Sequence, residues 1–251
     1  MAKPKIGAQL IIWGNRVKED ILGVLDEVSS IGYEGIEADT ATFEKIKDPM
    51  GLLDAKGLSL AGLHTGLESI DEKSIEVALN LLQRLDGHYL IFSGAGGKEN
   101  AEENYRRSSR VLEKIGKKAK AYGVKVCYHN HWQEIINDAT GIRIICEETS
   151  PEYVSLCVDT YWVKCGGLSP VEFIKRHLDR VAYLHLKDGT DEGMKRYEFR
   201  ELGHGDIDFP AIIDVAKKAE IEWYVVEQDR TNKTPKESME ISRKYLKALG
   251  I

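Results

Sequence analysis

Short apolar runs alternate with amphipathic stretches along the whole chain, and this alternation limits the fold more than any other feature of the sequence. Eight runs rich in β-branched residues occupy residues 5–12, 35–38, 58–63, 89–93, 125–128, 154–158, 181–184 and 223–226. Their nearly continuous apolarity predicts strands that are covered on both faces, as in a parallel sheet. Strict alternation selects either a closed barrel or an open doubly wound sheet. Eight rounds in 251 residues favour an α/β fold with a single (β/α)₈ barrel, the TIM barrel.

The stretches between the runs have apolar residues at spacings of three and four, which predicts helices. The clearest stripes are Ile21, Val24, Leu25 and Val28; Ile75, Leu79, Leu82 and Leu85; and Val111, Ile115 and Ala119. Ser169 before Pro170 and Thr234 before Pro235 predict helix starts. Residues 187–208 have no clear element, and this segment is either a lid over a bound substrate or a structural excursion.

Composition narrows the classes of function. The hydrophobic content of 42% is ample for one core, so we expect one domain over residues 1–251. A net charge of −6 gives no electrostatic footprint for nucleic acid or an anionic membrane. No apolar run has the length of a membrane span, and the N-terminus leads straight into a strand, so we expect a cytoplasmic protein. The net negative charge fits a small-molecule partner best. The sequence leaves the oligomeric state open, and a homo-oligomer is possible.

Four residues that can bind a metal stand at the ends of four successive predicted strands. They are His129, Asp159, His185 and Glu227. Each one alone has an ordinary structural explanation, such as a helix cap or a bond to the backbone. Side chains at the carboxyl ends of barrel strands project into the same mouth, so four in phase predict one bound divalent cation. Imidazole together with carboxylate favours Mn²⁺, Co²⁺ or Zn²⁺, with Mg²⁺ as a weaker alternative.

Several further residues stand near the same mouth. His131 follows His129 by two positions and could bond a substrate hydroxyl or the surroundings of the metal. Lys187 follows His185 by two and could meet a substrate oxygen. Trp13 and Trp162 could form an apolar wall for a sugar ring, although core packing explains both equally well. For His131 and Lys187 the alternatives are a loop histidine bonded to backbone and a solvated surface lysine.

Five motifs that occur in order resemble the sugar phosphate isomerase/epimerase family of xylose isomerase-like barrels, which includes tagatose epimerases, inosose dehydratase and endonuclease IV. They are Tyr128-His129-Asn130-His131, Val158-Asp159-Thr160, His185-Leu186-Lys187-Asp188, the run from Leu202 to Phe209, and Val226-Glu227-Gln228-Asp229. The resemblance implies a ketose, inosose or keto-sugar substrate bound to one metal ion. It also implies that the metal polarises a carbonyl while a carboxylate, here Glu227, removes the neighbouring proton. Glu37 and His64 fall where the family places substrate contacts or residues behind the ligands.

One departure from the epimerase branch concerns the mechanism. The resemblance implies that epimerases place two glutamates on opposite sides of the substrate. This chain has His129 where the second glutamate would stand. An imidazole that gives its lone pair to a metal cannot also act as a base. Same-face isomerisation or β-elimination is then easier to draw than epimerisation. The candidates for the required acid are His131, Glu134, Lys187 and His64.

Two other functions remain open at this point. The barrel could be a non-catalytic or accessory carbohydrate-binding subunit. It could also be a nuclease resembling endonuclease IV, which would use three zinc ions. Trp162 stands where that branch carries a ligand histidine, and no DxH pair precedes Glu227, so the nuclease is the weaker alternative.

Overall fold

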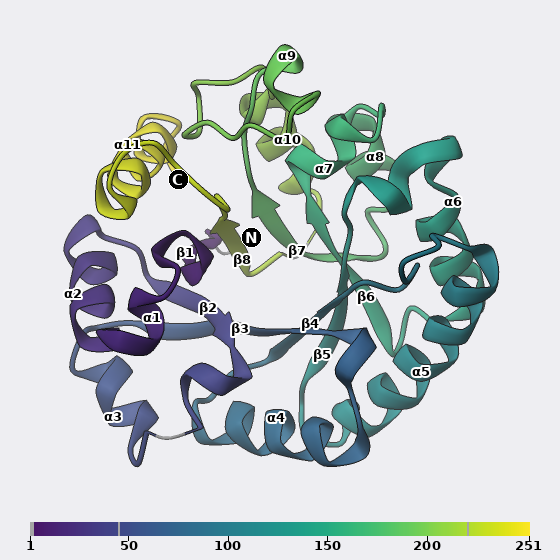
Figure 1. Ribbon diagram of the computed structural model, residues 1–251, viewed down its shortest axis with the longest axis horizontal. Coiled ribbons are helices and arrows are strands. Elements are labelled where there is room, and N and C mark those ends of the chain that lie inside the picture. The colour runs from purple at the N-terminus through teal and green to yellow at the C-terminus, as the bar shows by residue number, and fades with distance from the viewer. Residues whose placement is uncertain (1–2, 45, 220) are drawn as a thin grey trace.

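The computed structural model describes residues 3–44, 46–219 and 221–251, and it confirms the predicted closed barrel. Eight parallel strands pair in chain order, and the last strand closes the ring against the first, with Lys5 opposite Trp223 and Ala8 opposite Val226. Figure 1 looks into this ring, with the helices arranged around it. The strands are β1 Lys5–Gln9, β2 Gly35–Asp39, β3 Ser59–Gly66, β4 Tyr89–Ser93, β5 Lys125–His129, β6 Val154–Asp159, β7 Val181–Leu186 and β8 Trp223–Val226.

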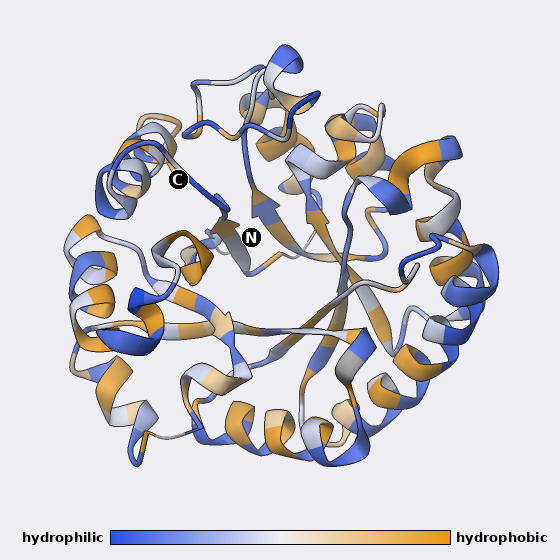
Figure 2. Cartoon of the chain, viewed as in Figure 1, coloured by the Kyte–Doolittle hydropathy of each residue, from blue (hydrophilic) through white to orange (hydrophobic). Residues whose placement is uncertain are grey.

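The helices form the outer layer of the barrel. They are α1 Arg16–Glu19, α2 Ile21–Ile31, α3 Pro49–Asp54, α4 Glu72–Arg84, α5 Glu102–Lys120, α6 Trp132–Glu148, α7 Thr160–Cys165, α8 Pro170–Arg176, α9 Asp191–Met194, α10 Phe209–Ala216 and α11 Pro235–Ala248, with 3₁₀ turns η1 Leu10–Trp13, η2 Thr40–Thr42 and η3 Leu67–Ser69. The predicted caps at Ser169 and Thr234 are confirmed. Hydrophobic and hydrophilic residues alternate around these helices in Figure 2. Within the described ranges, none of the helices has the length and apolarity needed to cross a bilayer.

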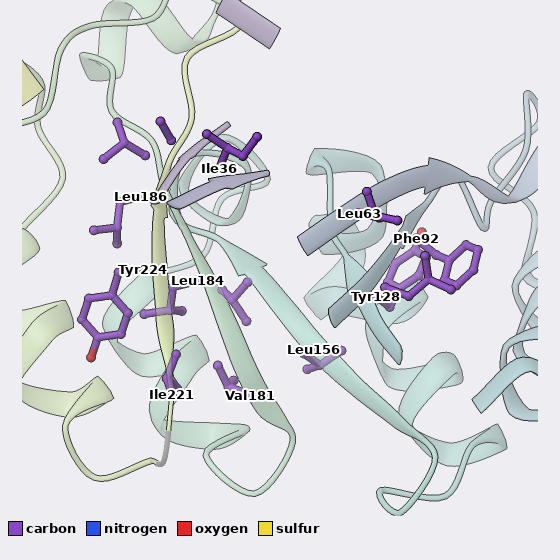
Figure 3. Packing of buried hydrophobic residues seen from close by; sticks show 14 of the residues in the cluster. Ile36, Leu63, Phe92, Tyr128, Leu156, Val181, Leu184, Leu186, Ile221 and Tyr224 are labelled. Atoms are coloured by element: carbon purple, nitrogen blue, oxygen red, sulfur yellow. The ribbon is translucent and has the colours of Figure 1, made fainter. Parts of the chain in front are cut away.

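The strands separate two apolar layers. Strand residues that include Ile36, Leu63 and Leu156 belong to the large cluster shown in Figure 3, together with buried residues of the helices. A smaller cluster contains Cys157, Tyr183 and Val225. Side chains alternate between the two faces of a strand, so Asp159, His185 and Glu227, each two positions further on, lie on the same side as this smaller cluster. The predicted ligands therefore follow directly on the packed interior of the barrel.

Most of the expected strand boundaries shift by one to three residues, and three expectations need a separate correction. The first strand ends at Gln9 rather than at residue 12, because the Gln9 side chain accepts a hydrogen bond from the backbone of Ile11 and starts a 3₁₀ turn. Val111 is 38% exposed, and the buried stripe of α5 runs through Leu112 instead. Residues 187–208 contain the short helix α9 and a bridge between Asp188 and Arg200.

Candidate active site

The four predicted ligands converge at the mouth of the barrel. His129 and Asp159 are the last residues of β5 and β6, His185 is the second-last residue of β7, and Glu227 directly follows β8. One ligand atom from each of them lies within 4.8 Å of the others, and all four residues are buried. Two donors that each lie about 2 Å from one metal ion are at most about 4 Å apart. The four atoms are therefore near the spacing that one ion requires, and the widest pair would have to approach by less than about 1 Å.

Three of these residues carry a buried atom that has no hydrogen-bond partner among the described residues. The atoms are Asp159 Oδ2, His185 Nδ1 and Glu227 Oε2. His185 Nδ1 and Glu227 Oε2 lie 2.5 Å apart, as a histidine–carboxylate contact that lacks the geometry of a hydrogen bond. The second oxygen of Asp159 is occupied, because it caps α7 by accepting from the Trp162 amide at 2.8 Å. Buried polar atoms are normally paired, so three orphaned atoms facing one point fit a divalent cation.

Glu37 contacts His185, one of the four predicted ligands, from behind. Its carboxylate contacts His185 Nε2 at 2.7 Å and His64 Nδ1 at 3.0 Å, and the other nitrogen of His64 lies 3.2 Å from Ser93 Oγ. This contact leaves His185 Nδ1 as the nitrogen that faces the other ligands. A carboxylate behind a metal-binding histidine fixes the orientation of the ring and raises its basicity. The structure thus places Glu37 behind the ligands and fully buried, away from the residues that line the cavity.

Lys187 is a buried cation among three carboxylates. Its ammonium donates to Glu227 Oε1 at 2.8 Å and to Asp229 Oδ1 at 2.6 Å, and it lies 3.8 Å from Asp159 Oδ2. The centroid of the Trp162 ring lies 4.8 Å from the nitrogen. Lys187 therefore fixes one oxygen of Glu227 and leaves the other oxygen facing the remaining ligands.

These contacts set the charges of the site. Burial raises the pKa of Asp159 to about 7, although the nearby Lys187 opposes the shift. Burial also disfavours the charged form of Glu227, but Lys187 and His185 outweigh it and hold the pKa of Glu227 well below its ordinary value. Burial lowers the pKa of His131 to about 4, with Lys187 acting in the same direction. Glu227 is therefore ionised and His131 neutral at pH 7.

A cavity of about 300 Å³ lies at the carboxyl ends of the strands, and two of the four predicted ligands, Asp159 and His185, lie outside its lining. Its lining includes His129 and Glu227 together with three residues named by the sequence, His64, His131 and Lys187. This volume is at the lower end of the range for small-molecule sites. The predicted lysine and histidines are therefore brought together around one small opening.

The remaining sequence candidates lie elsewhere. Trp13 is buried with its indole N–H donating to Glu27 at 2.7 Å, and it lies outside the lining of the cavity. Glu134 uses both oxygens, one for the His131 amide at the start of α6 and one for the Tyr128 hydroxyl. Trp162 contacts the His131 ring at 5.6 Å between centroids, but the Lys187 ammonium already covers it. None of the three offers an open surface to a sugar ring.

Sequence reasoning missed two residues close to the ligands. Asp229 lines the cavity and shares Lys187 with Glu227, and its position two residues after Glu227 was an available signal, because such residues lie on the same side of an extended chain. Cys157 lies below Asp159 on β6, with its sulfur 3.9 Å from His129 Nδ1. It also belongs to a cluster with His129 and His185. No sequence pattern pointed to that contact.

Comparison with known proteins gives relatives along the whole chain. The chain is 25% identical to the inosose dehydratase of Clostridium tetani (strain Massachusetts / E88) over 288 aligned positions, which cover 97% of this chain and 96% of that protein. Its fold matches a sugar phosphate isomerase/epimerase from Parabacteroides distasonis with a TM-score of 0.79 at 22% identity, covering 99% and 95% of the two chains. It also matches IolI, a protein solved with a bound zinc atom, with a TM-score of 0.75 at 17% identity over 98% and 97% of the chains.

The family assignment follows from a match to most of the chain. The model of the xylose isomerase-like TIM barrel family matches residues 25–249. These residues contain seven of the eight strands and all four predicted ligands. The chain therefore belongs to the xylose isomerase-like TIM barrel family.

Proposed function

We propose that this protein is a divalent-metal-dependent enzyme that removes a proton next to the carbonyl of a ketose, inosose or keto-sugar, as an isomerase, epimerase or lyase. The observation that carries the proposal is the set of orphaned atoms on Asp159, His185 and Glu227, which lie close together beside a small cavity that Glu227 lines. The names of relatives in the family, an inosose dehydratase and a sugar phosphate isomerase/epimerase, support the same substrate class.

His129, Asp159, His185 and Glu227 would hold the metal, and Mn²⁺, Co²⁺ or Zn²⁺ suits this donor set. When bound, such an ion polarises a carbonyl and makes the adjacent C–H more acidic. The zinc atom in the structure of IolI is consistent with that donor set. Asp159 and His185 are held by the Trp162 amide and by Glu37, so their free atoms already face the metal position before loading.

Glu227 is the proposed base. Its low pKa keeps the carboxylate ionised through the neutral range, and Lys187 fixes Oε1 so that Oε2 faces the site. A carboxylate oxygen has two lone pairs, so one lone pair of Oε2 would hold the metal and the other would accept the proton. Lys187 stays cationic, because the surrounding carboxylates raise its pKa despite burial, and it can stabilise negative charge on a substrate oxygen. His131 is neutral and can hydrogen-bond a substrate hydroxyl. We keep Glu134 out of this assignment because both of its oxygens are bonded.

A single base favours same-face proton transfer or elimination. No second carboxylate faces Glu227 from the position of His129, and Asp229 lies on the same side as Glu227, bonded to the same lysine. A proton removed by Glu227 would return to the same face of the substrate, or a leaving group would depart instead. We therefore favour aldose–ketose isomerisation or β-elimination over epimerisation.

Hydrogen–deuterium exchange tests the proposal. NMR in D₂O should show loss of one C–H signal from a member of a panel of ketoses, inososes and 3-keto-sugars when Mn²⁺ or Co²⁺ is added. Glu227→Gln should lower the exchange rate by about 10²–10⁴-fold, the range expected for a lost base, while the protein still binds Co²⁺. Glu222→Gln, at the opposite end of β8, is the matched control and should exchange at the wild-type rate.

The same experiment separates the alternative function. An accessory carbohydrate-binding barrel would bind members of the panel without exchange or product. Exchange that survives in Glu227→Gln would show that another group is the base.

A further inference from the structure

A second and larger hollow adjoins the cavity that His129 and Glu227 line. It has a volume of about 770 Å³ and lies between residues 39–44, which follow β2, and residues 64–78, which follow β3 and enter α4. The two cavities share four lining residues, namely Asp39, His64, Thr65 and Gly66. We call the larger hollow the β2–β3 groove. It opens on the carboxyl side of the strands, where the ligands also lie.

The boundary between the two cavities consists of a residue without a side chain, Gly66, and a hydrogen-bonded one, His64. A Cβ added to Gly66 would meet no atom within 4 Å, so the backbone there borders open space. His64 stands at the same boundary and is held on both nitrogens by Glu37 and Ser93. A ligand that occupies the smaller cavity can therefore continue over Gly66 into the groove without displacing a side chain.

The groove offers free polar groups beside an apolar wall. No hydrogen bond or ion pair to the side chains of Asp39, Thr65 or Lys73 is recorded within the described ranges, whereas Ser74 is bonded to Asp71. Val77, on the facing side of α4, is 36% exposed. Carboxylate, hydroxyl and ammonium groups can each bond a sugar hydroxyl, and an apolar wall can cover the C–H face of a ring.

The charge of the described part of the groove favours a neutral occupant over an anion. Asp39 and Glu44 contribute two negative charges, and Lys73 is the single cation in the lining as described. A phosphate or carboxylate would be repelled at this balance. A neutral, hydroxylated group meets no such penalty.

We propose that the β2–β3 groove binds a second sugar ring, so that the substrate is a keto-glycoside or keto-disaccharide whose reacting ring lies over His129, Asp159, His185 and Glu227. This inference rests on the proposed function, because it assigns the first ring to the ligand cavity. It adds a specificity site formed by the segments after β2 and β3, which contribute none of the four ligands.

Paired substrates test the groove. The pairs are D-fructose with lactulose and 3-keto-D-glucose with 3-ketosucrose, each measured with Mn²⁺-loaded protein by deuterium exchange and by calorimetric titration. The wild type should favour a two-ring member by at least about tenfold in kcat/KM or in Kd, which is about 1.4 kcal/mol. Val77→Trp, which fills the groove, should reduce that preference about tenfold.

Val111→Trp is the matched control. Val111 has a similar exposure, on the next helix α5, and lies outside the groove, so its substitution should leave the two-ring preference intact. Equal Kd values for both members of each pair in the wild type would overturn the proposal that the groove binds a second ring. Equal preferences in the two tryptophan variants would overturn it as well. A preserved preference in Kd without exchange on any compound would count against the proposed function alone. Absence of binding by every compound would overturn both.

Discussion

At the scale of single residues, the site depends on two buried charged side chains that each contact two others. Glu37 joins His185 to His64, and Lys187 joins Glu227 to Asp229. Burial by itself would raise the pKa of Glu37, but His185 and His64 hold it at about 2. Each of the two ligands is thus oriented by a buried ion whose other contact lies outside the ligand set.

The first prediction concerns Glu37. Glu37→Gln replaces one acceptor oxygen by an N–H donor that faces a ring nitrogen, so His185 loses its orientation. We expect Zn²⁺ affinity to fall about 10–100-fold, the usual effect of removing a residue behind a metal ligand. Competition with a chelator measures the Kd. Ser93→Ala, which removes only the second contact of His64, should bind Zn²⁺ like the wild type, and wild-type affinity in Glu37→Gln would contradict the role given to it.

The second prediction concerns Lys187. Lys187→Met keeps the volume but leaves Glu227 and Asp229 without their buried cation. Breaking a buried ion pair on one side costs about 3–5 kcal/mol, so the metal-free variant should unfold at lower denaturant concentration by that free energy. Adding Asp229→Asn should recover part of the loss. Lys195→Met is the control, because Lys195 pairs with Glu192 at an exposed site and should not change the unfolding midpoint measurably.

At the scale of elements, periodicity predicted the strands and helices well because it reports which faces are buried. The eight strands lie where the apolar runs stand, and the ligands are in phase with the barrel interior. Sequence reasoning missed short elements, and two of them, η1 and α9, begin with a side-chain cap from Gln9 and Thr190. A single local hydrogen bond, which leaves no periodic signal, decides these turns.

The histidine at the end of α8, His177, should make the stability of the protein depend on pH. Its Nδ1 lies 2.8 Å from the Phe173 carbonyl, and burial lowers the pKa of His177 below the ordinary value of 6.5. The unfolded chain therefore binds a proton more readily than the folded chain, so this contribution is complete above pH 6.5 and is lost as the pH falls below it. Denaturant unfolding from pH 8 to pH 5 should show a smaller loss of stability for His177→Gln than for the wild type. Parallel curves for the two proteins would exclude this contribution.

At the scale of the whole molecule, contacts between distant parts of the chain escaped sequence reasoning. Glu37 and His185 are 148 residues apart, and they meet only because β2 and β7 both face the interior of one closed ring. The convergence of the four predicted ligands could be foreseen because each stands at or just beyond the end of its own strand, in the same phase. Trp13 could not be placed, because its partner Glu27 lies on the neighbouring helix α2 and draws the indole away from the mouth.

Metal loading gives a prediction for the whole molecule. One ion per chain should bind, and a free Zn²⁺ concentration 100 times the Kd should raise the free energy of unfolding by about 2.7 kcal/mol. Elemental analysis measures the stoichiometry, and thermal unfolding with and without a chelator measures the stabilisation. Asp159→Asn, which removes a ligand charge, should lose most of the effect. Three ions per chain would favour the nuclease over the sugar enzyme.

The predicted ligands and the groove come from different parts of the ring, and this separation has a consequence for evolution and engineering. All four predicted ligands stand at the ends of β5, β6 and β7 or directly after β8, while the groove is formed by the segments after β2 and β3. Exchanging residues 40–58 or 67–78 with those of another barrel would change which substrates bind but would leave the residues of the proposed reaction in place. Reactivity and choice of substrate can then diversify independently, each inherited with its own half of the chain.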